Sequence, residues 1–426
     1  MGNSAIDSGL VPTRVRYRVI GMLGLLAMVT YLDRACIATL APNITKDLGL
    51  NKAQMSWVYS AFGLAYAFFE IPTAWWADRK GTRLVLTRIV LWWSAWTMMT
   101  GAAFSYVQLL VTRFLFGMGE AGAWPSVART FSRWIPLKER GRVQGVFFCG
   151  AHLAGGLTPV LVIFLNSFLR WRFIFLLFGI FGACWSIAWY RWFRNDPSEH
   201  SRVNAAEAAK IAEGRGPVVT DHAGWEYWRR ALGHPNILPL CLSYVPNSVA
   251  FYFCITWLPT MLSEKYAFKA MSLGLAAGSP LILSMVGDLF GGMATDTLSR
   301  RFGLRIGRAT VGITGNLVAG LAMIGAGFAK DPHLAVALVS ISVASTMFTL
   351  GAQWSTCQDI GGSHVGVVSA MMNTTGQLGS IFGPPIVTAL LAHFGNWNAP
   401  IFAIGCTFLV ATICWLFIDP NKKVFN

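Results

Sequence analysis

The sequence predicts an all-α membrane protein of twelve transmembrane helices arranged as two pseudo-symmetric six-helix bundles. Three observations lead to this prediction. Long apolar runs recur along the 426 residues, hydrophobic residues make up 54% of the chain and charged residues only 12%, and the two halves carry similar motifs at matching positions. Charged residues normally make up about a quarter of a soluble domain, so most of this chain is expected to lie in lipid.

Twelve apolar runs are long enough to cross a bilayer, whose hydrocarbon core takes about 20 residues of helix. They cover residues 18–42, 55–77, 84–105, 107–131, 143–165, 173–193, 237–262, 273–295, 309–329, 334–356, 365–394 and 399–418. The stretch between the sixth and seventh runs is polar. The predicted domains are therefore an N-terminal six-helix bundle (1–193), a cytoplasmic linker (194–236) and a C-terminal six-helix bundle (237–426).

Basic residues gather on alternate loops. They precede the first run at 14–18 and follow the second, fourth and eighth runs at 79–83, 133–142 and 300–308. Because Lys and Arg are in excess on cytoplasmic loops, both termini are predicted to be cytoplasmic in a multi-pass protein of the cell inner membrane. The net charge of +15 is then a consequence of topology, and we expect no nucleic-acid partner.

Two halves of similar sequence indicate an internal repeat. The second run ends at Asp78 and the eighth near Asp296, each followed by basic residues, and Glu70 and Asp288 precede these aspartates at the same spacing. Transporters with such repeats hold their substrate at the interface between the halves. We interpret Glu70 and Asp288 as parts of a latch near the cytoplasmic helix ends, with substrate contact as the alternative.

Ionisable residues inside the apolar runs are the strongest functional signal. Asp33 and Arg34 lie in the first run, and Arg113, Gly117 and Glu120 share one helical face of the fourth. A charge in the bilayer centre costs at least ~2.5 kcal/mol, so such residues are expected to face an interior cavity. Arginine stays charged and grips carboxylates, whereas a desolvated carboxyl takes up a proton more readily.

The prediction that follows assigns roles to these four charges. Asp33 and Glu120 are the proton-coupling carboxyls, and Arg34 and Arg113 bind the anionic substrate. The alternative is that the four form structural salt bridges with one another. Gly117 is expected to allow close approach of a neighbouring helix.

Polar residues elsewhere in the runs complete the candidate binding site. His152 falls opposite Gln377 when the fifth and eleventh runs are aligned on their prolines, and its imidazole could relay protons, bind substrate or be a hydrogen-bonded core residue. Gln353, Asn373 and Gln377 could donate hydrogen bonds to hydroxyl groups. Cationic residues in one half and neutral polar residues in the other favour a sugar acid as substrate.

Several motifs carry a resemblance to a known family. ADRKGTR (77–83) matches the signature loop of the major facilitator superfamily, although Ala74 replaces the usual leading glycine. YLDR (31–34) and RFLFGMGEAGAWP (113–125) resemble the anion:cation symporter family, which includes bacterial hexuronate and sugar-acid transporters and is similar to sialin and the vesicular glutamate transporters.

This resemblance implies proton-driven uptake of an organic anion by a monomer. It implies that Tyr31, Tyr66, Trp354 and Asn373 line the pocket. It also implies a cytoplasmic latch, composed of Asp78, Arg79, Gly81, Arg83, Asp296 and Arg300.

The expected function is proton-coupled symport of an organic anion, a hexuronate or related sugar acid, by alternating access. An anion exchanger or uniporter, and a membrane nutrient sensor that does not transport, are the alternatives. An enzyme is not expected, because the runs contain no metal-ligand cluster or nucleophile triad. No cofactor or metal is predicted, and the expected partners are a small organic anion, protons and lipid.

Overall fold

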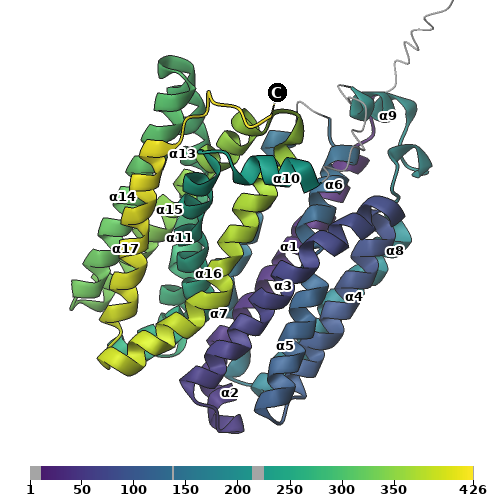
Figure 1. The fold of residues 1–426 in the computed structure, drawn as a ribbon. Helices are drawn as coiled ribbons and strands as arrows, with labels where there is room; N and C mark the ends of the chain where they lie inside the picture. Colours follow the sequence, from purple (N-terminus) through teal and green to yellow (C-terminus); the bar gives the residue numbers. More distant parts are fainter. Residues whose placement is uncertain (1–10, 137–138, 214–224, 426) are drawn as a thin grey trace, which may run out of the picture.

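The computed structural model describes residues 11–136, 139–213 and 225–425, and it consists of long helices that run side by side (Figure 1). In the first half these are α1 (Val15–Thr39), α3 (Lys52–Lys80), α4 (Thr82–Gly101), α5 (Tyr106–Glu120), α6 (Ala123–Trp134), α7 (Arg140–Asn166) and α8 (Trp171–Trp192). In the second half they are α11 (Ile237–Thr256), α12 (Leu258–Tyr266), α13 (Ala270–Phe302), α14 (Leu304–Phe328), α15 (Pro332–Gly361), α16 (Val365–Phe394) and α17 (Asn398–Cys414). The all-helical prediction is confirmed.

Among the described residues, nine helices are long and apolar enough to cross a membrane. The other three predicted spans correspond to α3, to α4 and to the pair α5 and α6. Helices α5 and α6 are each too short to span alone, because the helix is interrupted around Gly122, where a side chain would collide with Thr73. Short helices lie outside the spans, namely α2 (Ala41–Leu48), α9 (Ala205–Ala212) and α10 (Trp225–Leu232).

Side-chain caps fix where several of the long helices begin. Asn51, Ser105 and Asp331 precede α3, α5 and α15, and each accepts a hydrogen bond from the backbone N–H three residues later. Such caps satisfy N–H groups that the first helical turn cannot pair. The sequence therefore sets where these helices start. They start at the end of the molecule that carries α2, away from α9 and α10, and we call this the opposite end (Figure 1).

The two halves meet along two seams. Helix α7 packs against α13, and α3 packs against α16, so each seam joins one helix from each half. In the α7–α13 seam, a Cβ atom placed on Gly278 would lie 1.9 Å from the carbonyl oxygen of Gly156. In the α3–α16 seam, a Cβ on Gly63 would lie 2.4 Å from Ser380 Oγ. Small residues thus allow close helix approach, as is typical of membrane bundles.

The halves are also joined at the opposite end. Lys52 Nζ lies 2.6 Å from Glu264 Oε2, and Ser60 donates a hydrogen bond to the carbonyl of Ile381 at 2.7 Å. Both contacts link α3 to the second half. The two halves are therefore in contact at this end as well as along the seams.

The C-terminus, α9 and α10 lie at the other end of the molecule, which we call the linker end (Figure 1). There Glu207 of α9 is fully buried and accepts hydrogen bonds from the backbone N–H groups of Val15 and Arg16 at 3.1 Å. Arg16 also pairs with Glu139, Nε to Oε2, at 3.1 Å. The first part of the linker is therefore fastened to the N-terminal half.

Candidate substrate and proton site

Arg34 of α1 and Glu120 of α5 form a buried ion pair between two helices of the first half. The Nε of Arg34 donates to Oε1 of Glu120, and the two residues are 7% and 0% exposed. The Arg34 guanidinium also lies 5.1 Å from the ring centres of Phe62 and Tyr66. Arg34 Nη2 and Glu120 Oε2 have no hydrogen-bond partner among the described residues. One donor and one acceptor of the pair are thus unused.

Asp33 and Arg113 form a second, looser set of charges. Both are at least 97% buried, and neither Asp33 oxygen nor Arg113 Nε has a hydrogen-bond partner in the part of the chain that is described. The guanidinium of Arg113 lies 4.3 Å from the ring centre of Phe116. Asp33 interacts electrostatically with Glu120 and Arg113. The structure therefore brings the four predicted charges together, and Asp33 and Arg34 have different partners.

Gly117 has the role that the sequence predicts. A Cβ atom there would lie 2.5 Å from the carbonyl oxygen of Phe62 on α3. Any side chain would push α5 away from α3 and shift Arg113 and Glu120, which lie one turn before and one turn after it. This prediction is confirmed.

His152 of α7 faces Asp288 of α13 across the α7–α13 seam. Its Nδ1 lies 2.8 Å from Asp288 Oδ2, a distance for ion pairing, although the two groups are not aligned as a hydrogen bond. The ring of Tyr31 contacts His152 edge to face, with centres 5.9 Å apart. His152 is therefore held between an acid of the other half and a predicted pocket tyrosine.

Glu70 of α3 faces Asn373 of α16 across the other seam. The Nδ2 of Asn373 donates to both carboxylate oxygens, at 3.1 and 3.2 Å. Glu70 and Asp288 thus each contact a predicted site residue of the opposite half. Both contacts join the two halves, so the latch interpretation and the alternative of substrate contact both stay predictions.

The predicted polar residues of the second half divide into two groups. Gln353 is 0% exposed, and its amide accepts from Asn247 at 2.7 Å and donates to the carbonyl of Ser243 at 3.1 Å. It is therefore occupied within the C-terminal bundle rather than free for a substrate. Trp354 is 40% exposed, and Gln377 accepts from the hydroxyl of Tyr252 at 3.4 Å.

Three residues near the site were not predicted. Tyr244 and Tyr252 of α11 both interact electrostatically with Glu70, and Asn247 holds Gln353. The available signal was the spacing of Tyr244 and Tyr252 within one apolar run, since residues eight apart lie on one helical face.

The predicted latch residues have mixed placements. In the N-terminal half, Gly81 has φ +81° and lies against Asn195, whose side chain accepts from the backbone N–H of Arg83 at 2.9 Å. The guanidinium of Arg79 lies over Trp75 at 4.0 Å. The side chain of Asp78 lies outside the described part of the structure.

In the C-terminal half, the predicted latch residues Asp296 and Arg300 both lie near the end of α13. Arg300 donates to the backbone carbonyl of Asp296, as expected for residues one turn apart. The carboxylate of Asp296 lies 4.0 Å from Arg308 instead, and Arg308 pairs with Asp359 at 3.0 Å. The side-chain partner of Asp296 is therefore Arg308 of α14.

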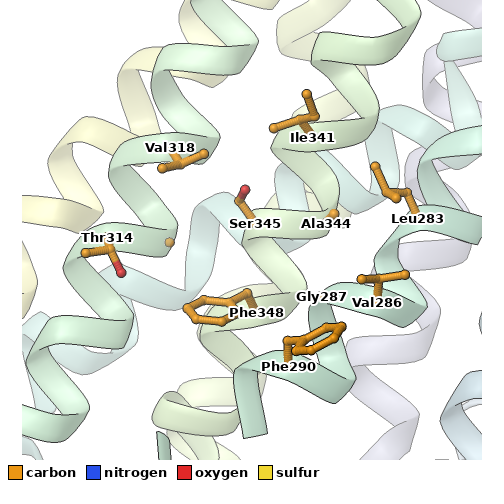
Figure 2. A pocket seen from close by; sticks show the side chains of 11 residues that line it. Leu283, Val286, Gly287, Phe290, Thr314, Val318, Ile341, Ala344, Ser345 and Phe348 are labelled. Carbon is orange, nitrogen blue, oxygen red and sulfur yellow. The ribbon is translucent and has the colours of Figure 1, made fainter. Parts of the chain in front are cut away.

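The cavity drawn in Figure 2 is separate from this site. Its volume is about 350 Å³, and it lies between α13, α14 and α15. Its lining is apolar apart from Thr314 and Ser345, and none of the predicted site residues contributes to it. It is a groove on the outer side of the C-terminal bundle.

Comparison with known proteins identifies the family. A model described as Major Facilitator Superfamily matches residues 23–384 and 300–426. The probable sulfoacetate transporter of Cupriavidus necator is 32% identical over 96% of this chain and 95% of its own. The probable galactarate/D-glucarate transporter of Escherichia coli K12 is 26% identical over 98% of both chains, and the hexuronate transporter of Bacillus subtilis is 27% identical over 94% of both.

A solved structure supports the same assignment at the level of fold. A bacterial homologue of the human lysosomal transporter Spinster, crystallised inward-facing and unoccupied, matches with a TM-score of 0.76 at 19% identity, covering 95% of this chain and 96% of the other. The relatives agree with the predicted anion:cation symporter family. The chain belongs to the Major Facilitator Superfamily, and it is a membrane transporter rather than an enzyme.

Proposed function

We propose that the protein is a proton-coupled symporter that takes up an organic anion, a hexuronate or related sugar acid, by alternating access. The observation that carries the proposal is the buried pair of Arg34 and Glu120. A buried ion pair with one unused donor and one unused acceptor can exchange its partner. A substrate carboxylate can replace that of Glu120 at the guanidinium, because the two groups have the same geometry.

Protonation supplies the coupling. While Glu120 is ionised it holds Arg34, and a free carboxylate must compete with it. Once Glu120 takes up a proton, Arg34 has no charged partner, and an uncompensated buried charge costs several kcal/mol. Binding of the anion removes this cost, so proton and anion favour each other's binding. In the same manner, Asp33 supplies a second carboxyl that can take up a proton, and Arg113 supplies a second guanidinium that can bind an anion.

The proposed substrate class follows from the other half and from the relatives. Asn373, Gln377 and Trp354 present amide groups and a partly exposed ring, which suit the hydroxyls and the carbon face of a sugar acid. The names of the relatives include hexuronate and galactarate/D-glucarate. We further propose a monomer in the cell inner membrane, with the linker end in the cytoplasm as the loop charges predict.

The test is transport by the purified chain in vesicles. An inward proton gradient should drive accumulation of a sugar acid such as glucuronate or galactonate by the wild type. Glu120→Gln should lose gradient-driven accumulation by about tenfold or more while retaining counterflow of labelled substrate. Glu226→Gln changes an exposed acid of α10 and is the matched control. If Glu120→Gln accumulates substrate with unchanged pH dependence, the coupling assignment is wrong and the exchanger or uniporter is favoured.

A further inference from the structure

The carboxyl group of Glu70 has only a neutral group as its direct partner. Both carboxylate oxygens accept from one neutral amide, that of Asn373, and among the described residues no Lys, Arg or His lies within ion-pairing distance. Arg34 interacts with Glu70 electrostatically, but its ion pair is with Glu120. A membrane-embedded carboxylate with only a neutral partner is costly.

When Asp33, Glu70, Glu120 and Asp288 are all ionised, the charges around the site leave a negative excess. Arg34 and Arg113 balance Glu120 and Asp33. Glu70 and Asp288 remain, and His152 can offset Asp288 when it is protonated. An anion that replaces protonated Glu120 at Arg34 leaves this excess in place, and the repulsion between like charges is stronger here than in water.

All these groups belong to one region of the interface. Tyr31 interacts electrostatically with both Arg34 and Asp288, and Tyr252 with both Arg34 and Glu70. Arg34 therefore shares a neighbouring tyrosine with each of the two acids, Glu70 and Asp288.

Aromatic side chains accompany Glu70. Tyr66 lies one turn before it on α3, and Tyr244 and Tyr252 of α11 act on it electrostatically. Tyr244 contacts Trp354 edge to face, with centres 6.4 Å apart. A carboxylate among aromatic rings is the combination that binds ammonium groups, through charge pairing and cation–π attraction.

We propose that Glu70 binds a cationic group of the substrate, which is therefore an aminated organic acid. The carboxylate or sulfonate end is held by Arg34 and the ammonium end by Glu70. This inference rests on the proposed function only in taking Arg34 as the anion anchor. It refines the substrate class from a sugar acid to one that also carries an amine.

The experiment uses pairs of ligands that differ in one group. Taurine and isethionate differ only in an ammonium in place of a hydroxyl, and so do 6-amino-6-deoxygluconate and gluconate. Binding to the purified full chain is measured by calorimetry and by thermal shift. We expect the amino member of at least one pair to bind about tenfold or more tightly than its hydroxyl partner, because a charge-assisted hydrogen bond is stronger than a neutral one.

The variants locate the effect. Glu70→Gln keeps the shape and the hydrogen bond to Asn373, and it should bring the ratio of the two affinities to about one. Glu226→Gln should retain the wild-type ratio. Because the ratio is measured within each protein, a partial loss of stability in the variant does not obscure it.

Three results overturn the proposal. The wild type could bind the hydroxyl members as tightly as the amino members, Glu70→Gln could keep the preference, or Glu70→Gln could change only the pH dependence, which would make Glu70 a proton site. Binding and proton-driven uptake of gluconate without any preference for amines would reject this inference alone. Failure of all four acids to bind would count against the proposed function as well.

Discussion

Asp288 of the C-terminal half lies 2.8 Å from His152 of the N-terminal half, Oδ2 to Nδ1. The contact joins the halves across the α7–α13 seam. Its counterpart in the other seam is Glu70 with Asn373. Each seam thus holds one acid and one polar partner from opposite halves, so the repeat that is visible in the sequence extends to the contacts between the bundles.

The first prediction concerns the His152 and Asp288 pair. His152→Gln and Asp288→Asn should each lower the free energy of unfolding by about 1–3 kcal/mol, because each removes one member of a close contact to a charged group. The double variant should lose less than the sum of the single variants. Thermal unfolding of the wild type, the two single variants and the double variant gives the four measurements of a double-mutant cycle. Strictly additive losses would show that the two side chains do not interact.

The second prediction concerns the glycines of the same seam. Gly278→Ala should destabilise the protein and reduce transport, because the added carbon would lie 1.9 Å from a backbone oxygen that cannot move aside cheaply. Gly150→Ala places a methyl group of the same size on α7 where no atom lies within 4 Å, and it should have little effect. Melting temperature and uptake rate are measured for both. Equal melting temperatures and uptake rates for the two variants would contradict the close contact between Gly278 and the backbone of Gly156.

The third prediction concerns pH and the linker. The pKa of His200 is lowered from 6.5, chiefly because burial disfavours the charged form, with Arg194 and Arg202 adding to the effect. Its ring packs edge to face against Trp192 and Trp134. The unfolded linker therefore binds the proton more readily than the folded one. The contribution of neutral His200 to the stability of the folded linker is complete above about pH 6.5, and it is lost as the pH falls below that value.

Hydrogen exchange of residues 194–203 tests this prediction. Exchange should be faster at pH 5.5 than at pH 7.5 after correction for the intrinsic rate. His200→Phe should remove the difference, because the ring packing is kept and the titration is lost. His393→Phe, at an exposed position at the end of α16, is the control. If the difference in exchange rate between the two pH values persists in His200→Phe, another titrating group causes it.

Residue spacing in the sequence was sufficient to predict the helical architecture and the meeting of the first and fourth spans. Arg113, Gly117 and Glu120 recur with the helical period, and a charge in lipid requires an interior partner. The contacts of Glu70 and Asp288 could not be predicted in this way, because they depend on how two distant helices cross. The hydrogen bond between Gln353 and Asn247 could not be predicted for a similar reason, since Asn247 lies on another helix of the same bundle.

The glycine crossing between α7 and α13 has a mechanical consequence. Where backbone meets backbone, the two helices can pivot but cannot approach further. The crossing then acts as a fulcrum, and a rotation that parts the bundles on one side must press them together on the other. In the alternating access that we propose, two residues without a side chain would thereby hinder simultaneous opening to both faces of the membrane, which would let the solute gradient leak away.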